Sequence, residues 1–424
     1  MNLYLGIDFG TTGARSTVID SQGTIHCETE YTFANNGQQQ TELPSVWQNA
    51  LWAVIEQIPP AIRNQVRAIA LDGTSSTVML CDTDGIPVCE PILYNDPRGA
   101  AVTERLRAIA PDNHTVISAT SSLAKLLWWL EGGHGGTAPT FFLHQADWLA
   151  FLLHGKLGIS DYHNALKLGF DVDTLCYPNW LTQGIAGAAT PELPQVVAPG
   201  TPVGEVRAQV GDRFGFPRDC MVCAGTTDSI AAFLASGVNS PGEAVTSLGS
   251  TLAVKLLSHT RVDDSRYGIY SHKLGDLWLV GGASNTGGAV LRHFFTDAEL
   301  DSLSKKIDAE KESLLDYYPL LKKGDRFPIN DPNLPPRLEP RPTDSLEFLH
   351  GLLESIARIE ARGYQLLQEL GATPLTKVYT AGGGAKNPVW SAIRKRYLKV
   401  PVETPIHTAA AYGSALLAKH GMQI

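Results

Sequence analysis

Two strand-like runs open the chain, and turn residues separate them. Residues 3–8 (LYLGID) and 15–20 (RSTVID) are rich in apolar and β-branched side chains, and residues 9–14 (FGTTGA) are rich in glycine and hydroxyl groups. This pattern predicts a β-hairpin. Further along the first half, the apolar pattern predicts strands at 66–71 and 78–81, and helices at 44–57, 124–131 and 145–153.

A similar pattern begins again after residue 235. Residues 242–254 (GEAVTSLGSTLAV) repeat the order of strand, Gly/Ser/Thr turn and strand. A helix is predicted at 346–370 and a strand at 377–380, which runs into the glycine-rich segment 381–385. A duplicated α/β unit, with a cleft between the copies, is the simplest explanation. The stretch 322–343, rich in proline and charge, is interpreted as a surface excursion.

Chain length supports two large domains, because a single core rarely extends to 424 residues. We predict a first domain over residues 1–235 and a second over 236–407. The apolar pattern at 409–419 predicts a last helix. This apolar pattern is compatible with residues 408–424 packing back on the first domain or joining the second.

Composition narrows the function classes. Hydrophobic residues make up 43% and charged residues 18%, a balance typical of globular proteins. The net charge of -9 disfavours nucleic acid as a partner, because phosphate backbones are bound mainly by clustered Lys and Arg. No apolar run approaches the roughly 20 residues that span a bilayer, so no membrane partner is expected. The first residues show no signal-peptide pattern, so we expect a cytoplasmic protein, or a plastid-stroma protein if a plant transit peptide was removed.

Six cysteines are present, and only Cys220 and Cys223 form a C-x-x-C pair. Residues 221–223 look like part of a buried strand, and side chains three apart on a strand point to opposite faces. The two thiols therefore cannot hold one metal ion together there. We interpret them as two core thiols.

Three turns carry residues suited to phosphate. Glycine lets the main chain approach closely, and successive N–H groups in a turn form an anion-binding concavity. The turn after Asp8 adds two hydroxyl groups, and the carboxylate suits a hydrated Mg²⁺. Residues 249–251 (GST) and 382–384 (GGG) offer two further sets. One such turn alone is usually a plain hairpin, so the interpretation depends on three in duplicated order. P-loop and Rossmann fingerprints do not occur in the sequence.

Asp228 follows the apolar run 221–223 and precedes an alanine-rich helix pattern at 230–234. In most proteins an Asp at such a junction caps the helix. As a general base, it would instead take the proton of an acceptor hydroxyl during phosphoryl transfer. The residues alone leave both interpretations open.

Six segments together resemble the FGGY family of carbohydrate kinases, within the actin/hexokinase/Hsp70 superfamily. Residues 6–12 are similar to the family's first phosphate loop, and residues 224–228 to the segment that carries its general base. The segments are GIDFGTT at 6–12, YNDPR at 94–98, DYHNA at 161–165, AGTTD at 224–228, NTGGA at 285–289 and GGGAKN at 382–387. The resemblance spans nearly the whole chain.

This resemblance implies a ribonuclease-H-like α/β fold in each domain, ATP and Mg²⁺ as cofactors, and a sugar as the second substrate. It also implies that Asp228 is the general base and that Asp8 and Asp228 face the metal ion. The residues expected to contact the sugar are Asp8, Ser75, Ser76, Asp96 and Asp228. The residues expected to bind ATP are Gly10, Thr11, Thr12, Gly249, Ser250, Gly288, Gly383, Gly384 and Asn387.

Ser75 and Ser76 bear on the choice of sugar. They fall where glycerol kinases resemble Arg-Glu and xylulose kinases Met-His, whereas ribulokinase-like relatives carry small Thr and Ser residues. The opening DFGTTGAR at 8–15 resembles pentulose kinases of cyanobacteria and plant plastids that act on D-ribulose. The resemblance therefore favours phosphorylation of D-ribulose to D-ribulose 5-phosphate, with xylulose or another polyol as the alternative. A packing role for the two serines stays open.

Two further classes stay open. Nucleotide-switched proteins without enzyme function, such as actin-like filaments and Hsp70-like chaperones, share the Asp-x-Gly-Thr-Thr hairpin. The sugar-side segments 94–98 and 161–165 favour an enzyme over this class. A degenerate kinase that binds ATP and barely turns over is the other alternative, and the presence of Asp8 and Asp228 argues against it.

Overall fold

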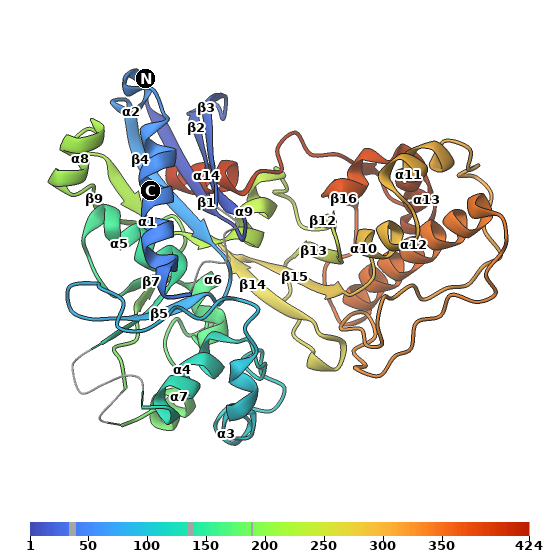
Figure 1. Ribbon diagram of the computed structural model, residues 1–424, viewed down its shortest axis with the longest axis horizontal. Coiled ribbons are helices and arrows are strands. Elements are labelled where there is room, and N and C mark those ends of the chain that lie inside the picture. Colours follow the sequence, from blue (N-terminus) through green and yellow to red (C-terminus); the bar gives the residue numbers. More distant parts are fainter. Residues whose placement is uncertain (34–39, 134–139, 188–189, 424) are drawn as a thin grey trace. The chain divides into compact units, whose positions relative to one another are not determined.

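The chain forms two compact units. The computed structural model describes residues 1–33, 40–133, 140–187 and 190–423. Unit 1 comprises Met1–Ala235 and His407–Ile424, and unit 2 comprises Ser236–Ile406 (Figure 1). Within the described ranges, no helix is long and apolar enough to cross a membrane.

Unit 1 is built on a seven-stranded sheet in the order β3-β2-β1-β4-β10-β9, with the short β11 beside β4. β1 is antiparallel to β2 and parallel to β4, and β4 is parallel to β10. The predicted hairpin is confirmed, whereas β3 was not predicted because its side chains are mostly exposed or half-buried. The strands are β1 Leu3–Phe9, β2 Gly13–Asp20, β3 Ile25–Thr32, β4 Val66–Gly73, β9 Pro202–Glu205, β10 Met221–Cys223 and β11 Thr226–Thr227.

Helices cover both faces of this sheet, which explains why every residue of β1 is buried (Figure 1). On one face, α14 (Ala410–Gly421) packs against β1, β2, β4 and the helix α9 (Asp228–Ala235). On the other face, α1 (Leu43–Glu56), α5 (Gln145–His154) and α8 (Ala208–Phe214) cover the larger core. The last helix of the chain therefore belongs to unit 1.

Two glycines allow α14 to approach so closely. A Cβ atom on Gly6 would lie 1.9 Å from the carbonyl oxygen of Ala411, and one on Gly413 would lie 1.8 Å from that of Ala231. Any side chain at either position would push α14 away from β1 or from α9.

A second core in unit 1 forms below the sheet, around Trp129 and Phe142. The strand predicted at 78–81 is confirmed, but it pairs with β6 in a separate two-stranded sheet and not with the main sheet. The remaining elements of unit 1 are β5 Val78–Cys81, β6 Phe141–His144, β7 Ile159–Asp161, β8 Gln195–Val197, α2 Pro60–Arg63, α3 Thr103–Ile109, α4 Ser122–Glu131, α6 Tyr162–Ala165 and α7 Asn179–Gly184.

Unit 2 contains a six-stranded sheet in the order β14-β15-β13-β12-β16-β17. β12 is antiparallel to β13 and parallel to β16, so these strands repeat the topology of β1, β2 and β4. The predicted duplication is thereby confirmed, with β14 as an added edge strand. The elements are β12 Glu243–Leu248, β13 Leu252–Ser258, β14 Tyr270–Leu274, β15 Leu277–Ser284, β16 Lys377–Ala381, β17 Val402–Glu403, α10 Gly288–Phe294, α11 Asp297–Ser304, α12 Ser345–Glu369 and α13 Pro388–Leu398.

The proline-rich stretch 322–343 is only partly the surface excursion that we predicted. Phe327 is fully buried in the core of unit 2, where Gly282 and Gly363 leave room for its ring. Asp325 is also buried, and it accepts a hydrogen bond from Ser284 Oγ at 2.7 Å. The rest of the stretch is mainly exposed or half-buried.

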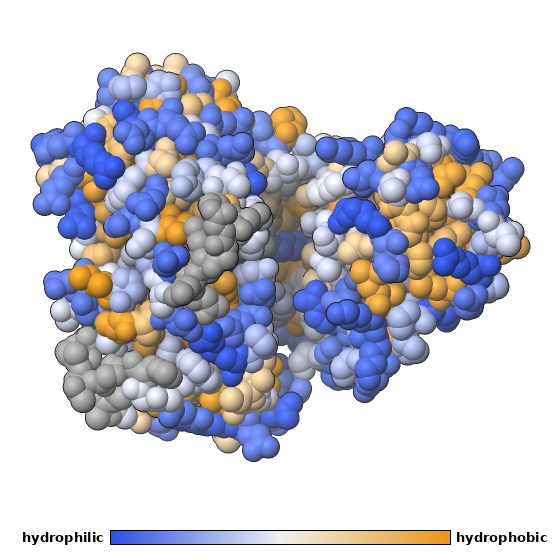
Figure 2. Space-filling view, in the orientation of Figure 1, coloured by the Kyte–Doolittle hydropathy of each residue, from blue (hydrophilic) through white to orange (hydrophobic). Residues whose placement is uncertain are grey.

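Elsewhere on unit 2, Figure 2 shows apolar side chains gathering on the surface over α10 and α12.

The C-x-x-C thiols lie on opposite faces of the main sheet, as predicted. Cys220 packs in the core beneath α1 and α5, and Cys223 packs beneath α14. Burial raises the pKa of Cys223 to about 12, so this thiol stays protonated at neutral pH.

Candidate active site

Three acidic residues meet at one end of the sheet in unit 1. Asp8 lies near the end of β1, Asp72 lies near the end of β4, and the parallel register pairs them directly. β11 pairs with the same end of β4, and Asp228 follows β11 as the first residue of α9. The carboxyl ends of parallel strands are where ligands bind in open α/β sheets, so this end is the candidate catalytic centre.

The electrostatics of these carboxylates follow from burial. Asp72 is fully buried and Asp8 is 5% exposed. Burial raises the pKa of Asp72 well above its ordinary value, and the charges of Asp8 and Asp228 raise it further. Burial also raises the pKa of Asp8, although Asp72 and Arg15 act in the opposite direction. Arg15 Nη1 lies 3.6 Å from Asp8 Oδ2.

Asp72 was not among the predicted site residues. Its Oδ2 accepts a hydrogen bond from Ser414 Oγ of α14 at 2.6 Å, and its Oδ1 is buried without a hydrogen-bond partner among the described residues. A signal was present in the sequence, because Asp72 directly follows the predicted strand 66–71, much as Asp8 ends the predicted strand 3–8. What was missing was the register that brings the two strand ends together.

The turn between β1 and β2 presents its polar groups outward. Gly10 N donates to Gly13 O at 3.0 Å, and Phe33 N donates to Thr12 O at 2.9 Å, so the main chain of the turn is fixed. Thr11 and Thr12 are both exposed. Their hydroxyl groups are accessible to a phosphate, as the predicted role requires.

Ser75 and Ser76 lie in the turn that follows β4. Ser75 is half-buried and Ser76 is buried. Ser76 has a φ of 63°, in the left-handed region that residues other than glycine rarely adopt, and its Oγ has no hydrogen-bond partner in the described structure. Thr74 and Thr77 brace the turn, since their hydroxyl oxygens lie 2.5 Å apart. A strained turn with an unused buried hydroxyl is typical of a functional position.

Asp96 lies in a neighbouring loop, where its Oδ2 accepts a hydrogen bond from Arg98 Nε at 2.9 Å and forms an ion pair with Arg98 Nη2 at 2.7 Å. Burial raises the pKa of Asp96, but Arg98 outweighs burial and holds the pKa below its usual value. Lys125 of α4 donates to the carbonyl oxygens of Ser76 at 2.6 Å and Leu93 at 2.7 Å. Lys125 was not predicted, because a lone lysine in a helical pattern carries no recognisable signal.

The segment 161–165 supports the strand that leads to Asp228. Asp161 Oδ1 accepts a hydrogen bond from His163 N at 2.8 Å, and His163 Nδ1 lies 2.7 Å from Thr226 Oγ1. Burial raises the pKa of Asp161 to about 7. In the described structure, this segment contacts β11 and so helps to fix the strand that precedes Asp228.

In unit 2, the predicted phosphate turn at 249–251 packs against the segment 285–289, which resembles the family, at the end of β12. Gly288 N donates to Gly249 O at 2.9 Å, and Ala289 N donates to Ser250 O at 3.0 Å. Ser250 Oγ also accepts a hydrogen bond from Arg292 Nη2 at 3.2 Å. The predicted residues 249, 250 and 288 thus form one cluster, and Arg292 adds a cation that was not predicted.

The third glycine-rich turn joins this cluster. A Cβ atom on Gly382 would lie 2.7 Å from Leu248 O, and one on Gly384 would lie 2.6 Å from Leu248 Cβ. Gly382 also has a φ of +83°, so this turn depends on glycine for both space and conformation. Gly383 has open space around it, which leaves its main chain accessible to a ligand.

Asn387 has a structural role in this arrangement. Its Oδ1 accepts a hydrogen bond from Trp390 N at 3.0 Å, so it caps α13, and its Nδ2 donates to Ser304 Oγ at 2.8 Å. If Asn387 also binds ATP, as predicted, it would do so while keeping these two hydrogen bonds.

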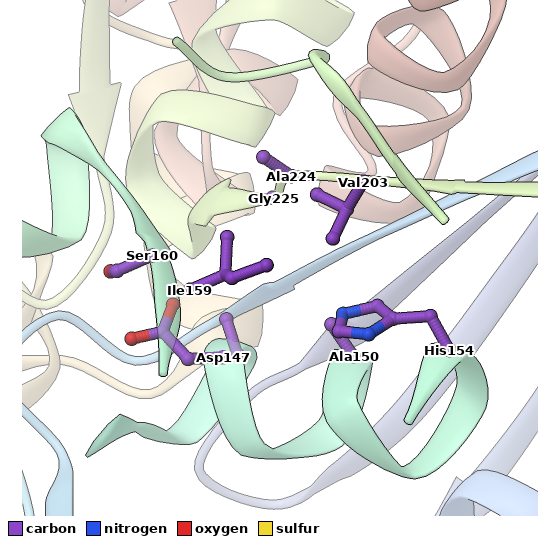
Figure 3. A pocket seen from close by; sticks show the side chains of 9 residues that line it. Asp147, Ala150, His154, Ile159, Ser160, Val203, Ala224 and Gly225 are labelled. Atoms are coloured by element: carbon purple, nitrogen blue, oxygen red, sulfur yellow. The ribbon is translucent and has the colours of Figure 1, made fainter. Parts of the chain in front are cut away.

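A small pocket lies behind the segment that leads to Asp228, and none of the predicted site residues lines it. Figure 3 shows Asp147 and His154 on one helix, across from Val203, Ala224 and Gly225. Burial lowers the pKa of His154 to about 4, so its ring is neutral near pH 7.

Comparison with known proteins identifies both units. The model of the FGGY family of carbohydrate kinases, N-terminal domain, matches residues 3–235, and that of the C-terminal domain matches residues 244–422. The chain is 22% identical to a xylulose kinase of Staphylococcus epidermidis, over 99% of this chain and 88% of the relative. It is 23% identical to an L-fuculokinase of Salmonella typhi, over 97% of this chain and 92% of the relative.

Solved structures share the same architecture. A xyloylose kinase from Brucella ovis superposes with a TM-score of 0.86 at 21% identity, covering 99% of this chain and 90% of that one. A glycerol kinase from Plasmodium falciparum with ADP superposes with a TM-score of 0.81 at 17% identity, covering 100% and 90%. The predicted two-domain fold of the actin/hexokinase/Hsp70 superfamily is confirmed. With both domain models matched, the chain belongs to the FGGY family of carbohydrate kinases, which are ATP-dependent phosphotransferases acting on sugar hydroxyl groups.

Proposed function

We propose that this chain transfers the γ-phosphoryl group of ATP to a hydroxyl of a pentulose, with D-ribulose as substrate and D-ribulose 5-phosphate as product. The observation that carries the proposal is the meeting of Asp8, Asp72 and Asp228 at one strand end, with the Ser75–Ser76 turn next in the chain after β4. A sugar held on that turn would present a hydroxyl to the carboxylates.

Asp228 is the residue that we assign as general base. Its side chain is only half-buried, which leaves it accessible to an acceptor hydroxyl, and its Oδ1 accepts a hydrogen bond from Ser229 N at 2.6 Å. During transfer, the hydroxyl proton passes to the carboxylate while the hydroxyl oxygen bonds to the γ-phosphorus. The bond between that phosphorus and the ADP oxygen breaks, and ADP leaves. This contact at the start of α9 orients the base.

Mg²⁺ fits the carboxylates at this strand end. The raised pKa of Asp72, caused by burial and by the charges of Asp8 and Asp228, reflects crowded acidic groups that a cation would relieve. Among the residues that the structure describes, no three acidic, His or Cys side chains form a ready metal site. Mg²⁺ commonly takes one or two carboxylates and keeps several waters, so Asp8 and Asp228 would suffice. When bound with ATP, the ion would neutralise charge on the phosphate oxygens.

D-Xylulose is the second candidate substrate. Relatives at 22% and 25% identity are xylulose kinases of Staphylococcus epidermidis and Streptomyces coelicolor, which supports this sugar. Ser75 and Ser76 favour D-ribulose, because xylulose kinases resemble Met-His at these positions.

A coupled assay of ADP release over D-ribulose, D-xylulose, glycerol and ribitol tests the proposal. We expect the highest kcat/KM with D-ribulose. A higher value with D-xylulose would replace the first candidate with the second. Release of ADP that no sugar accelerates would refute the sugar-kinase function of this chain.

A further inference from the structure

Lys125 is a buried lysine that the phosphoryl transfer itself does not use. It lies in the first half of α4 and is 0% exposed. A buried ammonium group is costly unless its donors are used. Its Nζ donates to the carbonyl oxygen of Ser76 at 2.6 Å and to that of Leu93 at 2.7 Å. One ammonium group therefore joins two loops that are distant in sequence.

Both loops carry residues expected to contact the sugar: the proposed function uses the Ser75–Ser76 turn, and the family resemblance adds Asp96. Ser76 lies in the turn after β4, and Leu93 precedes the loop that carries Asp96. A hydrogen bond from Tyr94 N to Thr77 Oγ1, at 3.0 Å, also ties the loops together. Lys125 adds the only charged donor among the described contacts between them.

The contact with Ser76 acts on a strained residue. Ser76 holds a φ of 63°, and this conformation persists only where its surroundings enforce it. A charged donor on its carbonyl oxygen is such a constraint, because charge-assisted hydrogen bonds are stronger than neutral ones. If the donor weakens, the turn can relax toward negative φ, and Ser75 and Ser76 would then lose their positions.

Burial brings the titration of Lys125 near neutral pH, and charged neighbours adjust it. Burial lowers the pKa of Lys125 to about 7; Lys167 and Arg98 act in the same direction, and Asp96 opposes them. Two further pairs of charged groups lie near α4, Arg105 with Glu131 and His144 with Asp147, and the helix α3 beside it also carries Glu104 and Arg107.

We propose that Lys125 is a positioning residue whose protonated side chain locks the two loops in the sugar-binding conformation, so that sugar affinity falls when Lys125 loses its proton. This inference rests on the proposed function, because it takes both loops as sugar contacts. The KM for ATP should not follow the same profile, since the contacts of Lys125 lie only in the sugar loops.

The first test is the pH dependence of the KM for D-ribulose in the wild-type protein. We expect the KM to rise by about tenfold as pH increases through 7 toward 8.5, because the neutral amine is the weaker donor. The contribution of Lys125 to stability should respond in the opposite direction. A lysine whose pKa falls on folding from 10.5 to about 7 costs stability below pH 7, and this cost disappears as pH rises. Loosening caused by the titration of Lys125 itself therefore cannot produce the expected rise in KM.

Two variants and a control complete the test. Lys167→Met removes a like charge near Lys125, so the midpoint of the KM profile should move to higher pH. Lys125→Met should raise the KM by about tenfold at pH 6.5 and abolish the pH dependence. Lys156→Met is the matched control, because Lys156 Nζ also donates to a carbonyl oxygen, that of Val203 at 2.5 Å, but on the surface. Its kinetics should equal those of the wild type.

A KM for D-ribulose that stays flat between pH 6 and pH 8.5 would overturn the inference while leaving the kinase function intact. An unchanged midpoint in Lys167→Met would overturn it too, even if Lys125→Met failed to fold. Absence of sugar-dependent ADP release from the wild type at every pH would instead refute the proposed function, and this inference with it.

Discussion

Asp72 and Asp228 show how two residues of one type take different roles at the same strand end. Asp72 is fully buried, and burial together with two neighbouring acids favours its neutral form. Asp228 is half-buried and starts a helix, so it stays accessible to a substrate. The family resemblance of residues 224–228 was what marked Asp228 as the candidate general base. Asp72 required the strand register, which no local pattern contains.

Ser75 and Ser76 carry the specificity prediction. Ser75→Ala and Ser76→Ala should each raise the KM for D-ribulose by about tenfold, because each removes a hydroxyl that the sugar would engage. The KM for ATP should stay within twofold of the wild-type value. Steady-state kinetics with each substrate varied in turn measure both effects. Unchanged sugar kinetics in both variants would mean that the serines only pack.

For the C-terminal helix α14, the sequence predicted a helix but did not determine which of the two domains it packs on. Its apolar pattern predicted a helix correctly, but several of its sides carry apolar or small residues, so the pattern did not select a partner. Contact with β1 and α9 depends on Gly6 and Gly413, whose importance appears only when the elements are packed. The same packing supplies Ser414 to Asp72, so α14 directly contacts the end of the sheet that we propose as catalytic.

Gly413→Ala should therefore destabilise unit 1. The new Cβ atom would lie 1.8 Å from Ala231 O, and a helix backbone cannot move aside cheaply, so we expect a loss of about 3 kcal/mol in the free energy of unfolding. Urea or thermal unfolding measures the change. Gly211→Ala is the control, because its Cβ atom would make only an ordinary contact at 3.6 Å. Equal stability of the two variants would contradict the packing that we describe for α14.

Across the whole molecule, the two units share a topology but differ in charge at equivalent positions. Three residues separate β1 from β2, and three separate β12 from β13, so Asp8 corresponds to Ser247. Ser247 pairs with Ala381 on β16, where Asp8 pairs with Asp72 on β4. Unit 1 therefore collects acids at its strand ends, whereas unit 2 collects glycine-rich turns and Arg292. This asymmetry agrees with the proposal that unit 1 carries the acceptor chemistry, while the glycine-rich turns of unit 2 supply most of the predicted ATP contacts.

The duplication itself was predictable from the order of strand, turn and strand, even though the two copies share few residues. The edge strands β3 and β14 were not predicted, and neither was the division of roles between equivalent positions. β3 and β14 lack the continuous apolar run that marks a central strand. The correspondence between Asp8 and Ser247 can be seen only from the register of both sheets.

Sugar-dependent ADP release by the wild type and by Asp228→Ala tests the central claim most directly. The wild type should release ADP at a rate that saturates with D-ribulose. Asp228→Ala should retain ATP binding but lose at least about 10³-fold in kcat, as expected for removal of a group that acts in the transition state. Near-wild-type turnover in Asp228→Ala would contradict the account, because the step from ATP binding to phosphoryl transfer is assigned to that carboxylate.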